Sequence, residues 1–287
     1  MSVPPSLQLP AEARSVRVPA GTGDLAALVA EPPQDVPSRP PVLLVPGYTG
    51  SKEDFLPILG PIARSGRRAV AIDLRGQHES GGPEDPAAYT IDALAKDVAT
   101  VLAGLGDAAH LVGHSFGGLV CRAAVLDGSR PASLTLLGSG PGALGGQRAA
   151  LVELMRPILD EGGVPALAEA AAAADRSNPK YVDVAPDVLA FLHQRLLNSP
   201  AAALRTMGEE LVTAADRTEH LRESGVPVLV AHGETDDAWS PEEQRRMAER
   251  LEAAYVSIAG SVHSPACEAP EKTVDTLLSF WASYDGM

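Results

Sequence analysis

A serine set between two glycines is the arrangement in this chain with the clearest capacity for chemistry. Residues 113–117 read Gly-His-Ser-Phe-Gly, behind an apolar stretch and ahead of a run of small and apolar residues. That order predicts a strand, a sharp turn and a helix, with the hydroxyl of Ser115 raised above the sheet. The following helix would point its first N–H groups at the charge that develops when serine attacks a carbonyl. The alternative is a glycine-rich turn of another parallel-sheet protein.

A serine hydroxyl is a weak nucleophile, so the rest of the chain has to supply a base and a carboxylate that orients the base. In the order nucleophile, acid, histidine, the base lies late in the chain. Of the seven histidines, His263 lies in a loop between the last predicted strand and the last predicted helix. His114, next to the serine, is expected to project away from the nucleophile. The sequence therefore predicts His263 as the base.

The acid is expected at the end of the preceding strand. Residues 228–233 lead from an apolar run into a turn that carries Glu234, Asp236 and Asp237. Asp236 is favoured, because the 27 residues from it to His263 accommodate one helix and one strand. Asp237 stays open as the acid, or as a cap of the turn that follows.

Acyl transfer also needs two backbone donors for the oxyanion. One is the N–H of the residue after the nucleophile, Phe116. The second is expected from the loop after the third strand, residues 46–50, where the N–H of Tyr48 is the candidate.

These groups need a scaffold, and the chain alternates apolar runs with helix-like stretches. A hairpin is predicted over residues 14–30, and six further strands are predicted at 42–45, 68–72, 110–112, 134–137, 226–231 and 255–258. Helices are predicted between and after them at 55–65, 91–102, 119–126, 241–251 and 270–284. Strands that alternate with helices predict an α/β fold, a mostly parallel eight-stranded sheet with helices on both faces.

The alternation breaks after the sixth strand. Residues 143–217 hold no convincing strand, and helices are predicted at 147–159, 164–174, 188–197 and 201–214. We interpret this part as a helical cap over the carboxyl edge of the sheet, where open α/β sheets bind ligands. The predicted organisation is a core of residues 1–142 and 218–287 with the cap between them. The alternative is that these helices belong to the ordinary helical layer.

Five side chains of the cap are candidates for the pocket lining, although nothing in the sequence fixes which of them face inward: Met155, Phe191, His193, Arg205 and Met207. For the two methionines, packing in the core is the favoured role.

The composition of the chain argues against several classes of binding partner. The 287 residues carry a formal net charge of −14, which argues against nucleic acid and anionic membrane surfaces, and solubility is the favoured meaning of this charge. The expected partner is a small-molecule substrate. Neither a signal peptide nor a transmembrane run is recognised. Cys121 and Cys267 have no metal-type spacing and suit a reducing cytoplasm. No metal-ligand cluster and no phosphate-binding fingerprint are found, and the oligomeric state is not determined.

Together these motifs resemble the α/β-hydrolase family, in its capped, lipase- and esterase-like form. The resemblance runs from the loop at residues 46–52 to residues 263–265. Residues 73–80 are similar to the family's Asp-x-Arg-Gly-x-Gly-x-Ser loop, in which Asp73 and Arg75 are expected to be structural. The sequence departs from the family at Pro46, where His is common, and at His78 and Val262, where Gly is common. Pro241 comes one residue late for an acid at Asp236, which is why Asp237 stays open.

The resemblance implies a hydrolase without cofactor or metal, with Ser115, Asp236 and His263 as the catalytic triad. Carboxylic ester hydrolysis is the favoured reaction, because it demands least of this machinery. Thioester, lactone, amide or C–C bond cleavage and perhydrolysis by haloperoxidase-like relatives remain open. A ligand receptor that no longer hydrolyses is a less favoured reading, because the triad is intact. The fold alone does not decide the substrate.

Overall fold

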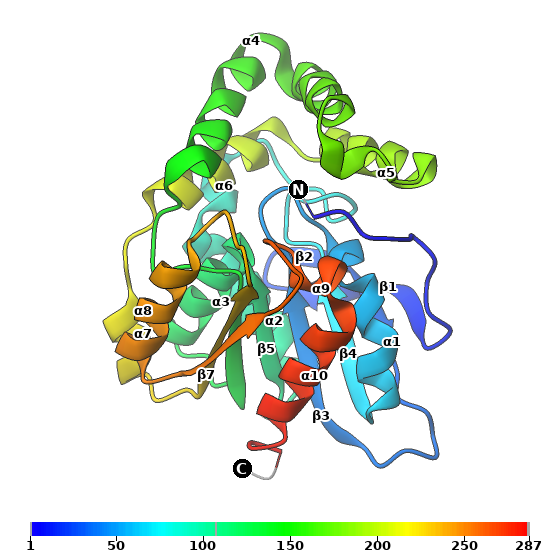
Figure 1. The fold of residues 1–287 in the computed structure, drawn as a ribbon, viewed down its shortest axis with the longest axis vertical. Coiled ribbons are helices and arrows are strands. Elements are labelled where there is room, and N and C mark those ends of the chain that lie inside the picture. Colours follow the sequence, from blue (N-terminus) through cyan, green and yellow to red (C-terminus); the bar gives the residue numbers. More distant parts are fainter. Residues whose placement is uncertain (1, 107, 286–287) are drawn as a thin grey trace.

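A computed structural model describes residues 2–106 and 108–285 of the chain (Figure 1). Within these residues, one eight-stranded sheet has the order β1-β2-β4-β3-β5-β6-β7-β8. Strand β2 is antiparallel to β1 and to β4, and all the other neighbours are parallel. The strands are β1 (Ala13–Ala20), β2 (Gly23–Ala30), β3 (Arg39–Val45), β4 (Arg67–Ile72), β5 (His110–His114), β6 (Ser133–Leu137), β7 (Val228–Gly233) and β8 (Ala254–Ile258). The expected mostly parallel sheet is thus confirmed.

The burial of the strands explains their sequence patterns. Strands β5, β6 and β7 are buried at every position, as continuous apolar runs in a parallel sheet require. The edge strand β1 has no fully buried residue and alternates partly buried with exposed positions. Such alternation is typical of a strand that presents one face to water.

Helices cover both faces of the sheet and close two apolar layers. One layer packs α1 (Leu56–Arg64), α9 (Pro265–Glu268) and α10 (Pro270–Trp281) on the sheet. The other packs α2 (Ile91–Ala103), α3 (Phe116–Leu126), α7 (Thr218–Glu223) and α8 (Pro241–Leu251). Short 3₁₀ turns lie at η1 (Lys52–Phe55), η2 (Pro86–Tyr89) and η3 (Pro179–Tyr181). Two rigid layers of this kind fix the loops at the carboxyl ends of the strands.

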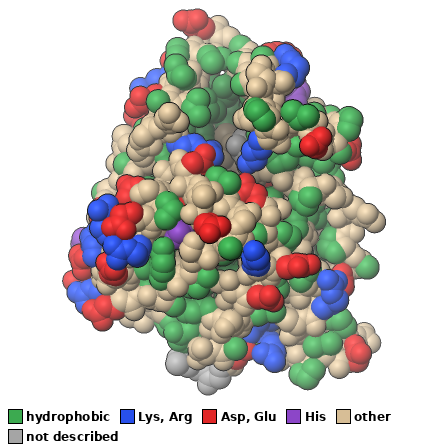
Figure 2. All heavy atoms as spheres, in the orientation of Figure 1, with side chains coloured by type: hydrophobic (Ala, Val, Ile, Leu, Met, Phe, Trp, Pro, Cys, Tyr) green, Lys and Arg blue, Asp and Glu red, His purple; other side chains and the backbone are tan. Residues whose placement is uncertain are grey.

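A helical insertion follows β6, as expected. It comprises α4 (Gly146–Arg176), η3, α5 (Pro186–Leu197) and α6 (Ala201–Thr213). Figure 1 shows these helices together at one end of the molecule, and Figure 2 shows a hollow beneath them. Helix α4 is broken at Gly163, whose φ of 66° no other residue adopts easily, so it consists of two helices at an angle. We call residues 146–213 the helical insertion.

The structure differs from the expected elements mainly at helix ends. Helix α3 begins at Phe116, three residues before the predicted start, because the glycines after the serine are themselves helical. The short helices α7 and α9 were not predicted, since six and four residues are too few for a periodic pattern. Within the described residues, no helix is long and apolar enough to cross a membrane.

Candidate active site

The turn that carries Ser115 is strained, and its neighbours are glycines for steric reasons. Ser115 has φ 53° and ψ −122°, a conformation that costs about 1–3 kcal/mol in a residue other than glycine. A Cβ on Gly113 would lie 2.5 Å from the carbonyl oxygen of Gly117. A Cβ on Gly117 would lie 2.5 Å from the carbonyl oxygens of Val45 and Pro46. Because these two positions carry no Cβ, β5 and α3 can meet at a sharp turn with the serine at its tip.

Three side chains from three strand ends form a chain of hydrogen bonds. The Oγ of Ser115 lies 3.0 Å from Nε2 of His263. Nδ1 of His263 lies 3.0 Å from Oδ1 of Asp236. The residues follow β5, β7 and β8, whose carboxyl ends meet at the same edge of the sheet. This is the geometry that makes a serine hydroxyl nucleophilic: the imidazole accepts its proton, and the carboxylate holds the imidazole in place.

The structure places Asp236, and not its neighbour, against the histidine. Burial opposes the charge of Asp236, but hydrogen bonds from His263, the Ala238 N–H and Gln244 outweigh it and lower its pKa below the usual value. Asp236 therefore stays ionised. The Asp237 carboxylate is instead exposed and pairs with Nη2 of Arg148 at 2.6 Å.

The loop after β3 passes close to the serine. A Cβ on Gly47 would lie 2.9 Å from the Cβ of Ser115, so a residue with a side chain does not fit at this position. Gln77 donates from Nε2 to the carbonyl oxygen of Gly47 at 2.8 Å and fixes the loop. The side chain of Tyr48 donates to the carbonyl oxygen of Leu204, in the helical insertion, at 2.8 Å. This loop thus joins the serine to the helical insertion.

The expectation that His114 projects away from the nucleophile is wrong. Its ring lines the same cavity as Ser115 and lies 5.1 Å from the ring of His263. Nε2 of His114 donates to the backbone oxygen of His263 at 2.8 Å. Burial, with the neighbouring His263, lowers the pKa of His114 to about 4, so the ring is neutral. His114 is therefore a positioning residue for the histidine loop, a role that its place beside the serine did not reveal.

Two further positioning residues escaped the sequence analysis. Oε2 of Glu268 accepts from the N–H of Val262 at 2.7 Å and from the N–H of Ser264 at 3.0 Å, on either side of His263. Gln244, fully buried on α8, donates to Oδ2 of Asp236 at 3.1 Å. Neither residue carries a sequence signal beyond its type, because each acts through a contact that only the fold creates.

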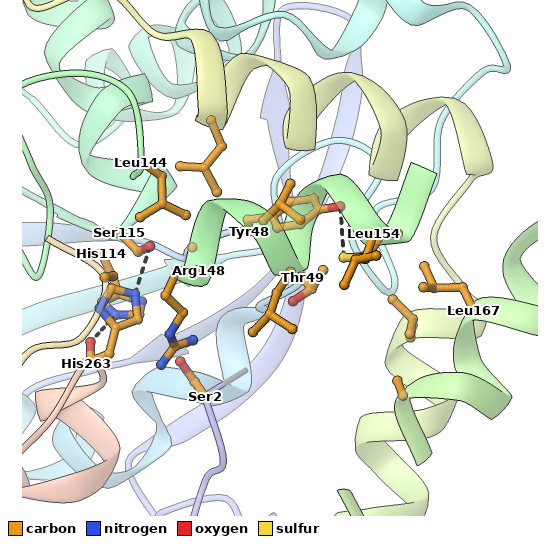
Figure 3. Close-up of a pocket in the computed structure, with 18 of the residues that line it drawn as sticks. Ser2, Tyr48, Thr49, His114, Ser115, Leu144, Arg148, Leu154, Leu167 and His263 are labelled. Atoms are coloured by element: carbon orange, nitrogen blue, oxygen red, sulfur yellow. Dashed lines mark hydrogen bonds between the residues drawn. The ribbon is translucent and has the colours of Figure 1, made fainter. Parts of the chain in front are cut away.

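Above the serine lies a cavity of about 320 Å³ (Figure 3). Apolar side chains of the helical insertion form much of its wall: Leu151, Val152, Leu154, Met155, Ile158, Leu167, Ala170, Ala171, Leu196 and Leu211. Figure 3 shows Ser115 and His263 at one end of this wall and Leu154 and Leu167 towards the other. A ligand bound here would have apolar surface against the helical insertion and its reacting atoms at the serine.

The cap residues singled out from the sequence divide between several environments. Met155 lines the cavity, and Met207 is buried in the core layer that covers α2 and α3. Phe191 packs against His78, His193 faces a second hollow, and Arg205 pairs with Asp160 at the surface. Of the five, Met155 thus lies where a substrate could touch it.

The charged residues Asp73 and Arg75, which follow β4, make structural contacts, as expected. The amide of Lys52 donates to Oδ1 of Asp73 at 2.7 Å, and its ammonium to Oδ2 at 3.0 Å. Arg75 pairs with the buried Asp97. His78 has φ 38°, which fits a position where the family commonly has glycine.

One group of side chains has the spacing of metal ligands. Glu53, His78 and Glu79 bring ligand atoms within 4.8 Å of one another. However, the ammonium of Lys52 lies 2.8 Å from both carboxylates. A lysine charge at the centre of the group neutralises the carboxylates and repels a cation, so we interpret it as an ion-pair network.

Comparison with known proteins finds several that are similar to this chain over most of its length. A proline iminopeptidase of Lactobacillus delbrueckii subsp. lactis is 28% identical over 268 residues, which cover 85% of this chain and 90% of that protein. A carboxylesterase structure from the thaumarchaeon Nitrososphaera gargenis matches with a TM-score of 0.75 at 19% identity, over 94% of this chain and 98% of that one. A thermophilic esterase of Thermogutta terrifontis, solved with malate bound, matches with a TM-score of 0.71 at 25% identity, over 95% of this chain and all of that one.

A family model described as the alpha/beta hydrolase family matches residues 42–276. The match spans the strained serine turn, the helical insertion and the histidine loop. The chain therefore belongs to the alpha/beta hydrolase family.

Proposed function

We propose that this protein is a serine hydrolase that cleaves carboxylic esters with an apolar acyl or alcohol group. The observation that carries the proposal is the hydrogen-bonded chain of Ser115, His263 and Asp236 at the floor of an apolar cavity. No metal or cofactor is needed for such a reaction, because the side chains supply nucleophile, base and orienting charge.

The proposed reaction has two halves. The Oγ of Ser115 attacks the ester carbonyl carbon while Nε2 of His263 takes the hydroxyl proton. The oxyanion that forms would accept hydrogen bonds from the N–H groups of Tyr48 and Phe116. Collapse releases the alcohol, which takes the proton from His263, and leaves an acyl-serine. Water, deprotonated by His263, then attacks the acyl carbon, and release of the acid restores Ser115.

The environment of His263 suits both halves. The carboxylate of Asp236 accepts from Nδ1 and so keeps Nε2 free to exchange the proton with Ser115. Two hydrogen bonds to the backbone limit the movement of the loop that carries His263. His114 donates to the carbonyl oxygen of His263, and Glu268 accepts from the N–H of Val262. The base therefore needs little rearrangement between attack and proton return.

An amino-terminal peptidase is the second candidate, because of the proline iminopeptidase relative. Such an enzyme has to balance the positive charge of a free amino terminus inside its pocket. Among the described lining residues the acidic one is Asp54, and its Oδ1 accepts from Nη1 of Arg195 at 2.7 Å. A carboxylate already neutralised in this way favours a neutral ester over a charged peptide end.

Active-site labelling tests the proposal directly. A fluorophosphonate probe is expected to attach to Ser115, with the adduct located by peptide mapping, and the protein is expected to hydrolyse p-nitrophenyl esters. Ser115→Ala removes the nucleophile and is expected to abolish both. Labelling that persists in this variant would refute the assignment of the nucleophile. A labelled protein that hydrolyses prolyl amides faster than esters would favour the peptidase, and an unreactive one the receptor.

A further inference from the structure

The segment of residues 2–7 lies between the helical insertion and the core, at the edge of the active-site cavity. It has no regular secondary structure, yet Ser2 is only 7% exposed and Pro4 is also buried. Ser2 is among the residues that line the cavity with Ser115 and His263. Figure 1 shows this end of the chain beneath α5, and Figure 3 shows Ser2 beside Arg148.

On the core side, the segment is bonded to the histidine loop. The Oγ of Ser2 lies 2.9 Å from the Oγ of Ser264, in a buried contact. Ser264 directly follows His263, and its own N–H is held by Glu268 at 3.0 Å. Displacement of Ser2 would therefore remove a buried contact from the residue that directly follows the base.

On the other side, the segment is bonded to the helical insertion. Nη2 of Arg195, on α5, donates to the carbonyl oxygen of Ser2 at 3.1 Å. Arg195 is only 1% exposed, and its Nη1 donates to Oδ1 of Asp54 in the core. A single buried guanidinium thus joins the segment, the helical insertion and the core.

Apolar contacts continue the attachment along the segment. Val3 and Leu7 pack against an apolar cluster of the helical insertion made of Tyr181, Val188 and Leu192. Leu9, two residues further on, is 42% exposed and is absent from this cluster. The change from packed to exposed side chains marks the end of the docked part.

We propose that residues 2–7 are a specificity-determining part of the active site, whose docking completes the cavity wall between α5 and the histidine loop. The inference rests on the proposed ester hydrolysis for its kinetic test. A docked segment excludes water from one side of the acyl or alcohol group, so substrates with more apolar surface gain most from it. When the segment is displaced, the triad remains but the cavity is open on that side.

Kinetics on matched variants tests this role. Val3→Asp with Leu7→Asp places two charges on the packed side, and Leu9→Asp is the control at an exposed position. Active sites are counted with a fluorophosphonate, and kcat and KM are measured for p-nitrophenyl esters from acetate to octanoate. The double variant is expected to raise KM several-fold for the long esters and to reduce the preference for them, with a smaller change in kcat per active site. The Leu9 variant is expected to behave like the unmodified protein.

A purely structural role would give another result. It would lower the melting temperature or the number of active sites, with KM and the chain-length preference unchanged. That result, or equal KM values in the double variant and the Leu9→Asp control, would overturn the inference. Failure of the unmodified protein to label at Ser115 would instead refute the proposed function.

A chemical probe tests the position of Ser2 without turnover and covers the case in which the double variant does not fold. Burial raises the pKa of both native thiols, Cys121 and Cys267, so their background reaction with a maleimide is slow. In Ser2→Cys, the new thiol is expected to react several-fold more slowly after Ser115 has been modified by a bulky phosphonate. In Leu9→Cys the rate is expected to stay the same. An unchanged rate at position 2 would show that Ser2 does not line the occupied site.

Discussion

The α/β core and the helical insertion are built by different rules, although both contribute to one cavity. In the core, two of the three strands that carry the triad, β5 and β7, are buried at every position, and the Asp236 carboxylate has three hydrogen-bond partners, His263, Ala238 and Gln244. In the helical insertion, α4 exposes Leu151 and Leu154, at 59% and 60%, beside the cavity. Large apolar side chains left in water next to a pocket indicate a binding surface rather than a finished core.

The two regions also use charge differently. Several links that hold the first half of α4 are exposed ion pairs, Arg148 with Asp237, Arg156 with Glu209 and Arg205 with Asp160. Exposed pairs of this kind contribute about 0–1 kcal/mol each and weaken with salt. Glycines with positive φ, Gly146 and Gly163, lie at both ends of that half-helix. The comparison teaches that buried hydrogen bonds fix the core side of the cavity, while exposed ion pairs and glycines hold the first half of α4 on the other side.

The largest effect on activity is expected from a substitution of Asp236, the proposed acid of the triad, because its buried surroundings tolerate little change. Asp236→Asn is expected to lower kcat by about 10⁴-fold, because the imidazole loses its orienting charge and its tautomer. Asp237→Asn is the matched control, and only its exposed pair with Arg148 would be lost. Steady-state kinetics per labelled active site provide the measurement. The reverse ranking would mean that the buried geometry misidentifies the acid.

Acid is expected to destabilise the core through two buried histidines. Burial is the main cause that lowers the pKa of both His110 and His114 to about 4, from 6.5 in the unfolded chain. Between these values the unfolded state binds more protons, so stability falls as the pH drops from about 6.5 to about 4, by about 3 kcal/mol for each histidine.

Urea unfolding at several pH values checks this prediction. His110→Gln removes one of the two titrating groups and is expected to make stability less dependent on pH across that window, whatever it does to stability at neutral pH. An identical pH slope in the variant would show that His110 is not neutral in the fold for the reason given.

A substitution in the wall of the cavity is expected to act on substrate choice and leave the triad alone. Leu167 is 4% exposed and lines the cavity, so Leu167→Ala removes apolar contact worth about 1–3 kcal/mol to a substrate that reaches it. KM for octanoate esters is expected to rise about tenfold or more, with little change for acetate. Arg205→Ala, whose side chain pairs with Asp160 at the surface, is the control. Equal effects at the two sites would contradict the division between wall and surface.

The smallest effect is expected from the exposed link between the two regions. Arg148→Gln breaks the pair with Asp237 and is expected to change the free energy of unfolding by less than about 1 kcal/mol. High salt should have a similar effect on the unmodified protein and little further effect on the variant. Calorimetry with and without salt provides the measurement. A loss of several kcal/mol would mean that the helical insertion is held as firmly as the core.

Local patterns in the sequence determined the strands, the helices and the order of the catalytic groups. The serine between glycines, the acidic turn after residues 228–233 and the histidine before the last helix each depend on neighbours in the chain. Because parallel strands end at one edge of a sheet, their order in the sequence is enough to predict that Ser115, Asp236 and His263 meet. The same reasoning predicted the helical insertion and the family, and the match to the family model confirmed the family.

Only the tertiary structure decided which neighbours act on those groups. Asp236 and Asp237 differ by one position, and the direction of a side chain at a turn depends on packing against α8 and the histidine loop. Ser2 and His114 contact the histidine loop from more than a hundred residues away in the sequence. Glu268 acts through a hydrogen bond to a backbone N–H, and such a contact leaves no periodic pattern in the sequence. The residues of the cavity wall could not be predicted from the sequence either. Which side chains face the cavity depends on how α4 is bent at Gly163 and packed on the core.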